Sequence, residues 1–518
     1  MSLWKGFFPQ RGLWWAGRFF LALAFFLSIS TGAAWGISIW PPGPPPFHYK
    51  NTKIIYYQEE WVDRYDGGSA DAATDLKVDR HRNVYVTGFS WDEAYDMVTI
   101  KYDNNGNRLW VQKYNDGKGT DDVALALGVD FDGNVYVVGW SGNINPPYGW
   151  SWYFFEDWPT GRVRRSSGPD DKTSYTIIKY SPTGQRLWVR HYPGSATGIN
   201  IPTAMKVDRF GNVYVTGYSW GIGTRYDYLT VKYDTNGNLQ WAARYDGGVQ
   251  GDDYAVALEV DSFGNVLVTG QSWGTEEDYL TLKYDSSGHK LWEVRWDGGA
   301  GRPSNFRFDI PSALVVDHRL NVYVTGCSYG GNPDTHSDMV TIKYDRWGNQ
   351  QWLHRYDGPG SYSPNDAPYA MVVDPMLNVY IAGTSEHWFC TIKLDQNGNL
   401  AWERFIEHYF GNNDQAIRLT LDRYGDILVT GDYQSEAANQ LDYATYKFTP
   451  NGDTTLVGIY AGPGNYDDHA SALGVDFEGN VFVTGFSSQV LPDSSITFDF
   501  ATVKYKRVVE RVKLPTIP

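Results

Sequence analysis

The strongest constraint on the fold is a phrase of six or seven residues that recurs eight times along the chain. Each copy ends in glycine, and successive closing glycines are separated by 51, 78, 53, 56, 57, 48 and 54 residues. A repeat of this length indicates a propeller, a solenoid or another array of similar units. The copies are Asn83–Gly88, Gly133–Gly139, Gly211–Gly217, Gly264–Gly270, Asn321–Gly326, Asn378–Gly383, Gly425–Gly431 and Gly479–Gly485.

Each unit contains four short runs of strand-like sequence. In the unit Val256–Trp296 they are the run that ends at Asp261, the repeated phrase, Asp278–Tyr284 and Lys290–Trp296. All four are rich in aromatic or β-branched residues and are bounded by Gly, Asn or Asp, which is typical of antiparallel strands joined by tight turns. Four such strands per repeat form a propeller blade, so we predict an all-β fold.

Turns such as Asp103–Asn107 and Asp234–Asn238 share the pattern D-x-N-G-N. The aspartate can accept hydrogen bonds from the backbone that follows it, and the glycine can adopt a positive φ. The pattern also resembles part of a calcium loop, but the sequence lacks the rest of an EF-hand ligand set. We therefore interpret these segments as hairpin turns.

The two ends of the repeat region predict how the propeller closes. Trp61–Gly67 matches the fourth strand of a unit, whereas the last unit ends with a third strand, Asp499–Tyr505. Pairing these two segments would remove two exposed sheet edges. We predict a single eight-bladed β-propeller of four-stranded blades over residues 61–505, closed when the N-terminal strand at 61–66 completes the last blade.

The units resemble the bacterial SBBP-type β-propeller repeat, through the pattern A-x-x-V-D-x-x-G-N-V-Y-V-T-G followed by D-Y-x-T-x-K-Y-D-x-x-G-N-x-L-W. The resemblance covers about residues 61–505 and implies an exported propeller without an assigned activity. Quinoprotein repeats share the D-x-x-G-x-x-L-W turn, and NHL-type repeats share the GNVYV phrase. Neither of these weaker similarities transfers a site to this chain.

The N-terminus predicts export. Residues 1–36 contain Lys5, Arg11 and Arg18 and no acidic residue, and the apolar run Phe19–Leu27 is followed by small residues. This arrangement is typical of a secretory signal peptide cleaved after Gly36. The alternative is an uncleaved membrane anchor. Residues 37–60 are expected to form a Pro-rich spacer and residues 506–518 a C-terminal tail, so we expect an extracytoplasmic protein that is secreted, periplasmic or on the cell surface.

The net charge indicates which classes of partner to expect, and the two cysteines indicate whether a disulfide forms. The formal net charge is −16, and loss of residues 1–36 lowers it to −19. An acidic chain disfavours nucleic acid, which selects basic surfaces. We expect a monomer that binds a glycan or an extracellular protein and that meets a membrane only through an uncleaved N-terminal segment. Cys327 and Cys390 fall in different repeats, so we expect free thiols rather than a disulfide.

Two charged residues recur in every unit. The first strand ends in Asp (for example Asp79 and Asp261), and the third strand carries Lys (for example Lys101 and Lys283). Charges between packed blades must be paired or hydrogen-bonded. We therefore expect each Lys to bond a strand-end Asp or a nearby backbone carbonyl and to fasten neighbouring blades.

The loops on the opposite face are the predicted binding surface. They combine carboxylates with tryptophans, and between Ser141 and Tyr175 one loop expands into an aromatic insertion, residues 142–174. Such groups can bind sugars, cations or a basic protein surface. The alternative is that the aspartates cap turns and the tryptophans pack on their own loops. The candidate residues are Trp91, Trp140, Trp150, Trp152, Trp158, Trp220, Trp273, Asp122, Asp253 and Asp468.

Catalytic motifs are scarce in this sequence. It contains no HExxH or P-loop motif, and no catalytic residue or metal-ligand set is assigned. No cofactor is predicted, although the loop carboxylates are compatible with a bound cation such as calcium. The sequence favours a non-catalytic scaffold that binds a glycan, a cation or a protein. The alternative is an extracytoplasmic propeller enzyme, either a polysaccharide lyase or hydrolase or a quinoprotein-like oxidoreductase.

Overall fold

The computed structural model describes fourteen segments of the chain. They are residues 48–68, 70–143, 172–194, 198–248, 251–274, 277–298, 308–329, 337–359, 365–385, 388–406, 415–434, 440–464, 466–491 and 496–516. The chain divides into two units, Met1–Lys53 with Arg511–Pro518 and Ile54–Glu510. The first unit contributes only the beginning of β1 and the end of β32 to the described structure, and the second unit is the propeller.

The described residues form eight four-stranded sheets, which we number as blades 1 to 8. Blades 1 to 4 are β2 (Asp71–Val78), β3 (Val84–Asp92), β4 (Ala94–Tyr102), β5 (Arg108–Tyr114); β6 (Asp121–Val129), β7 (Val135–Asn143), β8 (Lys172–Tyr180), β9 (Arg186–Tyr192); β10 (Asn200–Val207), β11 (Val213–Gly221), β12 (Arg225–Tyr233), β13 (Leu239–Tyr245); β14 (Asp253–Val260), β15 (Val266–Trp273), β16 (Glu277–Tyr284) and β17 (Lys290–Trp296).

Blades 5 to 8 continue the pattern, and the last blade draws on both ends of the chain. They are β18 (Asp309–Val316), β19 (Val322–Tyr329), β20 (Ser337–Tyr344), β21 (Gln350–Tyr356); β22 (Ala367–Val373), β23 (Val379–Ser385), β24 (Trp388–Leu394), β25 (Leu400–Ile406); β26 (Gln415–Leu421), β27 (Ile427–Gln434), β28 (Leu441–Phe448), β29 (Thr454–Tyr460); β30 (Asp468–Val475), β31 (Val481–Val490), β32 (Ile496–Thr516) and β1 (His48–Tyr65).

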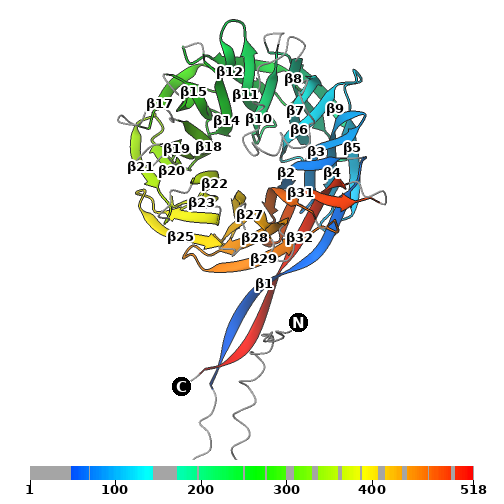
Figure 1. The fold of residues 1–518 in the computed structure, drawn as a ribbon, viewed down its shortest axis with the longest axis vertical. Coiled ribbons are helices and arrows are strands. Elements are labelled where there is room, and N and C mark those ends of the chain that lie inside the picture. Colours follow the sequence, from blue (N-terminus) through cyan, green and yellow to red (C-terminus); the bar gives the residue numbers. More distant parts are fainter. Residues whose placement is uncertain are drawn as a thin grey trace, which may run out of the picture. The chain divides into compact units, whose positions relative to one another are not determined.

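The blades form a closed ring with their first strands innermost (Figure 1). The first strand of every blade contacts that of the next, and β30 of blade 8 contacts β2 of blade 1. In blade 8 the order is β1-β32-β31-β30, so the N-terminal strand completes the blade that the C-terminal strand leaves open. The predicted all-β, eight-bladed fold and its mode of closure are confirmed.

The two faces of the ring carry different connections between strands. The face that carries the turns between first and second strands and between third and fourth strands, such as 79–83 and 103–107, is called the turn face here. The face that carries the second-to-third-strand loops and the links between blades is called the loop face. Because the strands are antiparallel, each kind of connection falls consistently on one face.

The aspartate that ends each first strand caps its own turn. Asp79 Oδ1 accepts hydrogen bonds from the backbone N–H groups of His81 (2.7 Å) and Asn83 (2.8 Å). Its Oδ2 accepts from the Asn83 amide (2.7 Å) and from the Tyr85 hydroxyl (3.0 Å). Asp103 caps its D-x-N-G-N turn in the same way, with Asn105 and Asn107 as donors. The interpretation of these segments as turns is therefore confirmed.

The recurring lysines and fourth-strand tryptophans fasten neighbouring blades. Lys101 and Trp110 of blade 1 both donate to the Pro182 carbonyl oxygen of blade 2, at 2.9 and 3.1 Å. Lys504 and Trp61 of blade 8 donate in the same way to the Asn104 carbonyl oxygen of blade 1. The other pairs with a shared acceptor are Lys179 and Trp188 on Thr235, Lys232 and Trp241 on Ser286, and Lys393 and Trp402 on Pro450.

Two of the recurring lysines use a carboxylate instead of a carbonyl. Lys283 lies 3.1 Å from Asp261, a strand-end aspartate, and Lys447 lies 2.9 Å from Asp426. The buried Lys343 has its ammonium 5.1 Å from the centre of the Tyr323 ring. The expected hydrogen bonding is confirmed for the seven lysines with a carbonyl or carboxylate partner. Fastening of neighbouring blades is confirmed for the five that bond a carbonyl, whereas the contacts of Lys283 and Lys447 lie within blades 4 and 7.

The hydrophobic core lies between blades. One cluster joins Val84, Val86 and Ile100 of blade 1 to Ala472 and Phe482 of blade 8. Because each blade shares its apolar faces with two neighbours, burial of these side chains stabilises the ring as a whole. Cys390 is buried and Cys327 is half-buried, and no disulfide joins them, as expected.

The sheet extends beyond the predicted boundaries at both ends. β1 begins at His48, inside the segment expected to be spacer, and β32 runs to Thr516, through most of the expected tail. Side-chain contacts hold these extensions together within the propeller unit. Lys506 lies 3.0 Å from Glu60, and the Tyr56 hydroxyl donates to Glu510 at 2.8 Å. Residues 1–47 lie outside the described structure. None of the described residues forms a helix with the length and apolarity that a membrane span requires.

Candidate functional site

The three candidate aspartates of the loop face are buried. Asp122 accepts a hydrogen bond from the Asp116 backbone N–H (2.9 Å), Asp253 from that of Gly247 (2.8 Å) and Asp468 from that of Gly462. Burial raises the pKa of Asp122 and of Asp253 to about 6. These carboxylates therefore hold the links between blades.

The candidate tryptophans that the structure describes differ in exposure. Trp91 and Trp220 are half-buried and pack edge-on against Tyr95 and Tyr226, with ring centres 4.7 and 5.1 Å apart. Trp273 is 40% exposed. Trp150, Trp152 and Trp158 lie outside the described residues, as does most of the insertion 142–174.

Trp140 differs from the expectation that it lies on the loop face. Its side chain is 0% exposed and belongs to a core cluster with Val123 and Ile201. The reason is its place in the repeat. Trp140 follows the closing glycine directly, as Phe89 does, whereas Trp91 stands three residues after that glycine. Phe89, Tyr218 and Phe486 hold the same position in blades 1, 3 and 8 and are buried in the same cluster.

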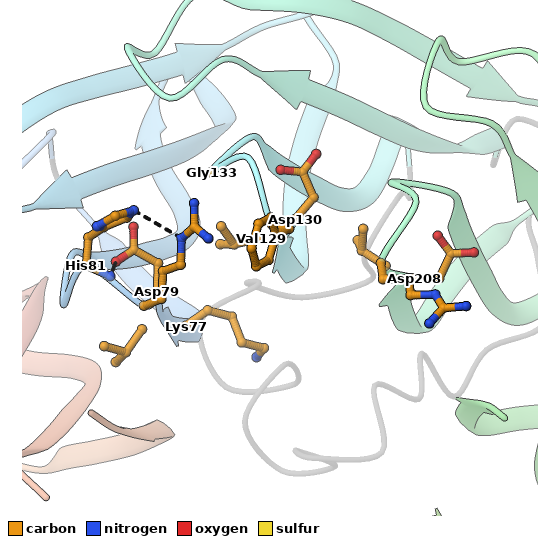
Figure 2. A pocket seen from close by; sticks show the side chains of 12 residues that line it. Lys77, Asp79, His81, Val129, Asp130, Gly133 and Asp208 are labelled. Carbon is orange, nitrogen blue, oxygen red and sulfur yellow. Dashed lines mark hydrogen bonds between the residues drawn. The ribbon is translucent and has the colours of Figure 1, made fainter. Parts of the chain in front are cut away.

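The turn face carries a hollow that the loop-face prediction did not include. Its volume is about 400 Å³, and turns of blades 1, 2 and 3 line it. Figure 2 shows Lys77, Asp79 and His81 on one side, Asp208 on the other, and Val129, Asp130 and Gly133 between them. A hollow of this size lies in the range of small-ligand sites.

The exposed groups of this hollow are cationic and aromatic. Arg80, His81, Arg209 and Phe131 all belong to its lining and are exposed, Phe131 by 68%. The Arg80 guanidinium lies 3.9 Å from the centre of the Phe131 ring, and its Nε donates to His81 Nε2 at 3.1 Å. Lys77 also lines the hollow and pairs with Asp75 at 2.6 Å. Arg80 and Arg209 are thus the guanidinium groups offered to a ligand.

The carboxylates of the hollow face their own turns. Asp130 and Asp208 each accept hydrogen bonds from the backbone and side chain of the asparagine four residues later and from a tyrosine hydroxyl. Asp79 does the same. Since these oxygens are already occupied by donors, no carboxylate of the lining is a free acid or base, and the groups it exposes include the Arg80 and Arg209 guanidiniums, the His81 imidazole and the Phe131 ring.

An exposed apolar residue recurs in the same turn of six blades. The turn after each capping Asp has two central positions, and a large apolar side chain in either one is left with little to pack against. The sequence could therefore have revealed these exposed residues, because each is an aromatic residue or Met between the capping Asp and the fourth position of its turn. The six residues are Phe131, Phe210, Phe263, Met376, Tyr424 and Phe477.

Comparison with known families agrees with the repeat identified from sequence. Residues 194–223 match the model of the SBBP β-propeller repeat. A curated relative, an uncharacterized WD repeat-containing protein (L264) from Acanthamoeba polyphaga mimivirus, is 23% identical over 344 residues. That alignment covers 53% of this chain and 23% of the relative, so the chain corresponds to less than a quarter of that protein's length.

Solved structures with similar chain traces are distant in sequence. A protein from Lactobacillus plantarum has a TM-score of 0.43 at 13% identity and covers 75% of this chain and 98% of its own. The β-propeller domain of the Trilobed protease from Pyrococcus furiosus has a TM-score of 0.41 at 9% identity, covering 76% and 100%. A PL25 ulvan lyase has a TM-score of 0.39 at 11% identity, covering 76% and 95%. We draw no functional argument from these similarities.

Proposed function

We propose that this protein is an exported, non-catalytic scaffold that binds an acidic polysaccharide in the turn-face hollow. One observation carries the proposal: Arg80 and Arg209 are exposed in the same hollow as the exposed Phe131 ring. Guanidinium groups form paired hydrogen bonds with carboxylates, and an aromatic ring offers a flat apolar surface to a sugar ring.

The charge of the surroundings supports an anionic ligand at this place. The chain as a whole is acidic, with a formal net charge of −16, so most of its surface repels polyanions. In the hollow the aspartates are capped by donors, and Lys101 and Lys179 lie close enough to Asp79 and Asp130 to offset their charge. The exposed arginines are then left to select the ligand.

The signal-like N-terminus supports an extracytoplasmic setting for this binding. Residues 1–36 have the basic start, the apolar run and the small residues of an export signal. Outside the cytoplasm, uronic-acid polymers provide carboxylates at regular spacing along a stiff chain. The cations of the hollow lie on blades 1 and 3, on either side of blade 2, so they can meet more than one of these carboxylates.

Titration calorimetry with defined oligogalacturonates tests the proposal, with neutral dextran fragments as the comparison ligand. We expect binding to oligogalacturonate only. The double variant Arg80→Ala, Arg209→Ala should weaken it at least about tenfold, because each charged hydrogen bond contributes about 1.5–3 kcal/mol.

Arg423→Ala is the matched control. Arg423 lies on the same face in blade 7, stacked at 4.8 Å on Tyr424, and is not part of the hollow. Its loss should leave affinity within a factor of two. Equal binding of dextran, or equal effects of the two sets of variants, would contradict the proposal. Shortening of the oligomers by the wild-type protein during the titration would instead support the enzyme alternative.

A further inference from the structure

Among the residues that the structure describes, three boundaries between blades bring three carboxylates close together on the loop face. Every trio combines an Asp of one blade's third strand, an Asp that follows its fourth strand and an Asp at the start of the next blade. In each trio, one oxygen from every residue lies within 4.8 Å of the others. The trios are Asp499, Asp66 and Asp71 between blades 8 and 1; Asp227, Asp246 and Asp253 between blades 3 and 4; and Asp338, Asp357 and Asp366 between blades 5 and 6.

One arginine accompanies each trio and leaves it with excess negative charge. Arg64 lies 2.9 Å from Asp499, Arg244 lies 2.7 Å from Asp227, and Arg355 lies 2.6 Å from Asp338. Three carboxylates and one guanidinium sum to a charge of two negative units when all are ionised. Such an excess at partly buried positions is unfavourable without a further positive charge.

Buried oxygens in these trios have no hydrogen-bond partner. Asp499 Oδ1, Asp227 Oδ1 and Asp366 Oδ1 make no hydrogen bond, and these three residues are at most 1% exposed. A buried carboxylate oxygen without a donor costs free energy. These unpaired oxygens and the excess negative charge indicate that a positively charged group belongs beside them.

The boundary between blades 1 and 2 shows what replaces that group. Asn115 stands there in the position of Asp66, five residues after the fourth-strand tryptophan. Its Nδ2 donates to Asp96 Oδ1 at 2.6 Å, and Lys113 lies 3.2 Å from Asp96. An amide N–H and an ammonium therefore satisfy the third-strand carboxylate at this boundary. Where the position holds Asp, no such amide donor exists.

We propose that each of the three trios binds a calcium ion. Calcium binds carboxylate oxygens at about 2.3–2.6 Å, so two oxygens on opposite sides of one ion lie up to about 5 Å apart. The oxygens of each trio lie within 4.8 Å of one another and can therefore bind the same ion. All donors are hard oxygens, which favours Ca²⁺ over softer transition metals. The exposed members Asp66, Asp246 and Asp357 open each site to solvent. Two positive charges neutralise the trio and its arginine.

The site between blades 8 and 1 also bears on ring closure. Asp66 follows β1, Asp499 lies on β32, and Asp71 begins β2. A calcium ion there would hold the N-terminal strand, the C-terminal strand and the first blade together. Extracellular calcium sites work at about 10⁻⁴–10⁻³ M, a range suited to an exported protein.

Equilibrium dialysis of the full chain against calcium chloride at pH 7.5, after treatment with EDTA, tests the proposal. We expect saturable binding of at least three ions per chain. Asp246→Asn should remove one ion. In EDTA this variant should melt at a temperature equal to or higher than the wild type, because its amide can donate as Asn115 does. Calcium should raise its melting temperature less than it raises that of the wild type.

The reciprocal variant creates a site. Asn115→Asp completes a trio with Asp96 and Asp122, so it should add one calcium ion per chain and lower the melting temperature in EDTA. Absence of saturable binding in the wild type would overturn the proposal. Wild-type stoichiometry in Asp246→Asn, with a folded protein shown by circular dichroism, would overturn it as well.

Discussion

The ammonium group of Lys101 in blade 1 donates a 2.9 Å hydrogen bond to the carbonyl oxygen of Pro182 in blade 2. The indole of Trp110 donates to the same oxygen, and the equivalent pair at the ring closure, Lys504 and Trp61, shares the carbonyl of Asn104. The junction formed by the two chain termini is therefore built like a junction between consecutive blades. At these junctions, the lysine recurs in the third strand because it bonds the neighbouring blade.

The turn that receives these donors requires glycine. Gly184 has φ +85°, and a Cβ there would lie 2.8 Å from Trp110 Cγ. Gly184→Ala should lower the free energy of unfolding by about 2–4 kcal/mol, the sum of a left-handed backbone and an overpacked contact. Gly117→Ala is the control, because Gly117 has φ +77° with nothing within 4 Å, and it should cost only about 1–2 kcal/mol. Urea denaturation measures both, and equal costs would contradict the packing role.

A histidine between blades 7 and 8 should make stability depend on pH. His469 Nδ1 lies 2.7 Å from Asp432 Oδ2. Burial opposes the imidazolium, but the Asp432 carboxylate outweighs burial and raises the pKa of His469 above its ordinary 6.5, with Asp467 and Asp468 acting in the same direction. The stabilisation is fully present below about pH 6.5 and is lost as pH rises through the raised pKa.

Asp432→Asn tests this ion pair, since an amide keeps the shape without the charge. At saturating calcium chloride, the wild type should lose more stability than the variant between pH 6 and pH 9. Melting temperatures across that interval provide the measurement. Parallel pH profiles for the two proteins would show that His469 gains no proton on folding.

Because of the carboxylate trios, we predict that acid stabilises the calcium-free protein and destabilises the calcium-bound protein. Asp71, which faces Asp66, Asp499 and Arg64, has its pKa raised by burial from 3.8 to about 6. The folded protein then binds more protons than the unfolded chain between these values. In EDTA, the unfolding free energy should rise as pH falls from 7 toward 4. With calcium, the unfolding free energy should fall over the same pH range, because protons displace the ion. Thermal melts in both buffers measure this difference.

The sequence predicts the fold well because every repeat carries the same pattern of strands and turns. Each turn depends on the Asp and Gly within it, and each strand shows the same alternation. The number of blades and their closure follow from counting strands, including the unpaired strand at 61–66. The extension of β1 back to His48 was missed because residues 48–60 depart from the repeat pattern.

The candidate site was harder to predict because it depends on which side chains are left exposed. Trp140 and Trp91 differ by two positions relative to their glycines, and only the structure shows that one is buried and the other half-buried. Asp122 and Asp253 were expected on an exposed binding surface, but both are buried and accept backbone hydrogen bonds from the links between blades. Arg80 and Phe131 were overlooked since they belong to turns of the opposite face.

Hydrogen–deuterium exchange with and without oligogalacturonate tests most directly whether the turn face binds the ligand. We predict slower exchange on binding in the turns at residues 79–83, 130–134 and 208–212, which line the hollow, and no change around Asp122 and Trp273 on the loop face. Protection confined to the loop face, or none at saturating ligand, would contradict the account.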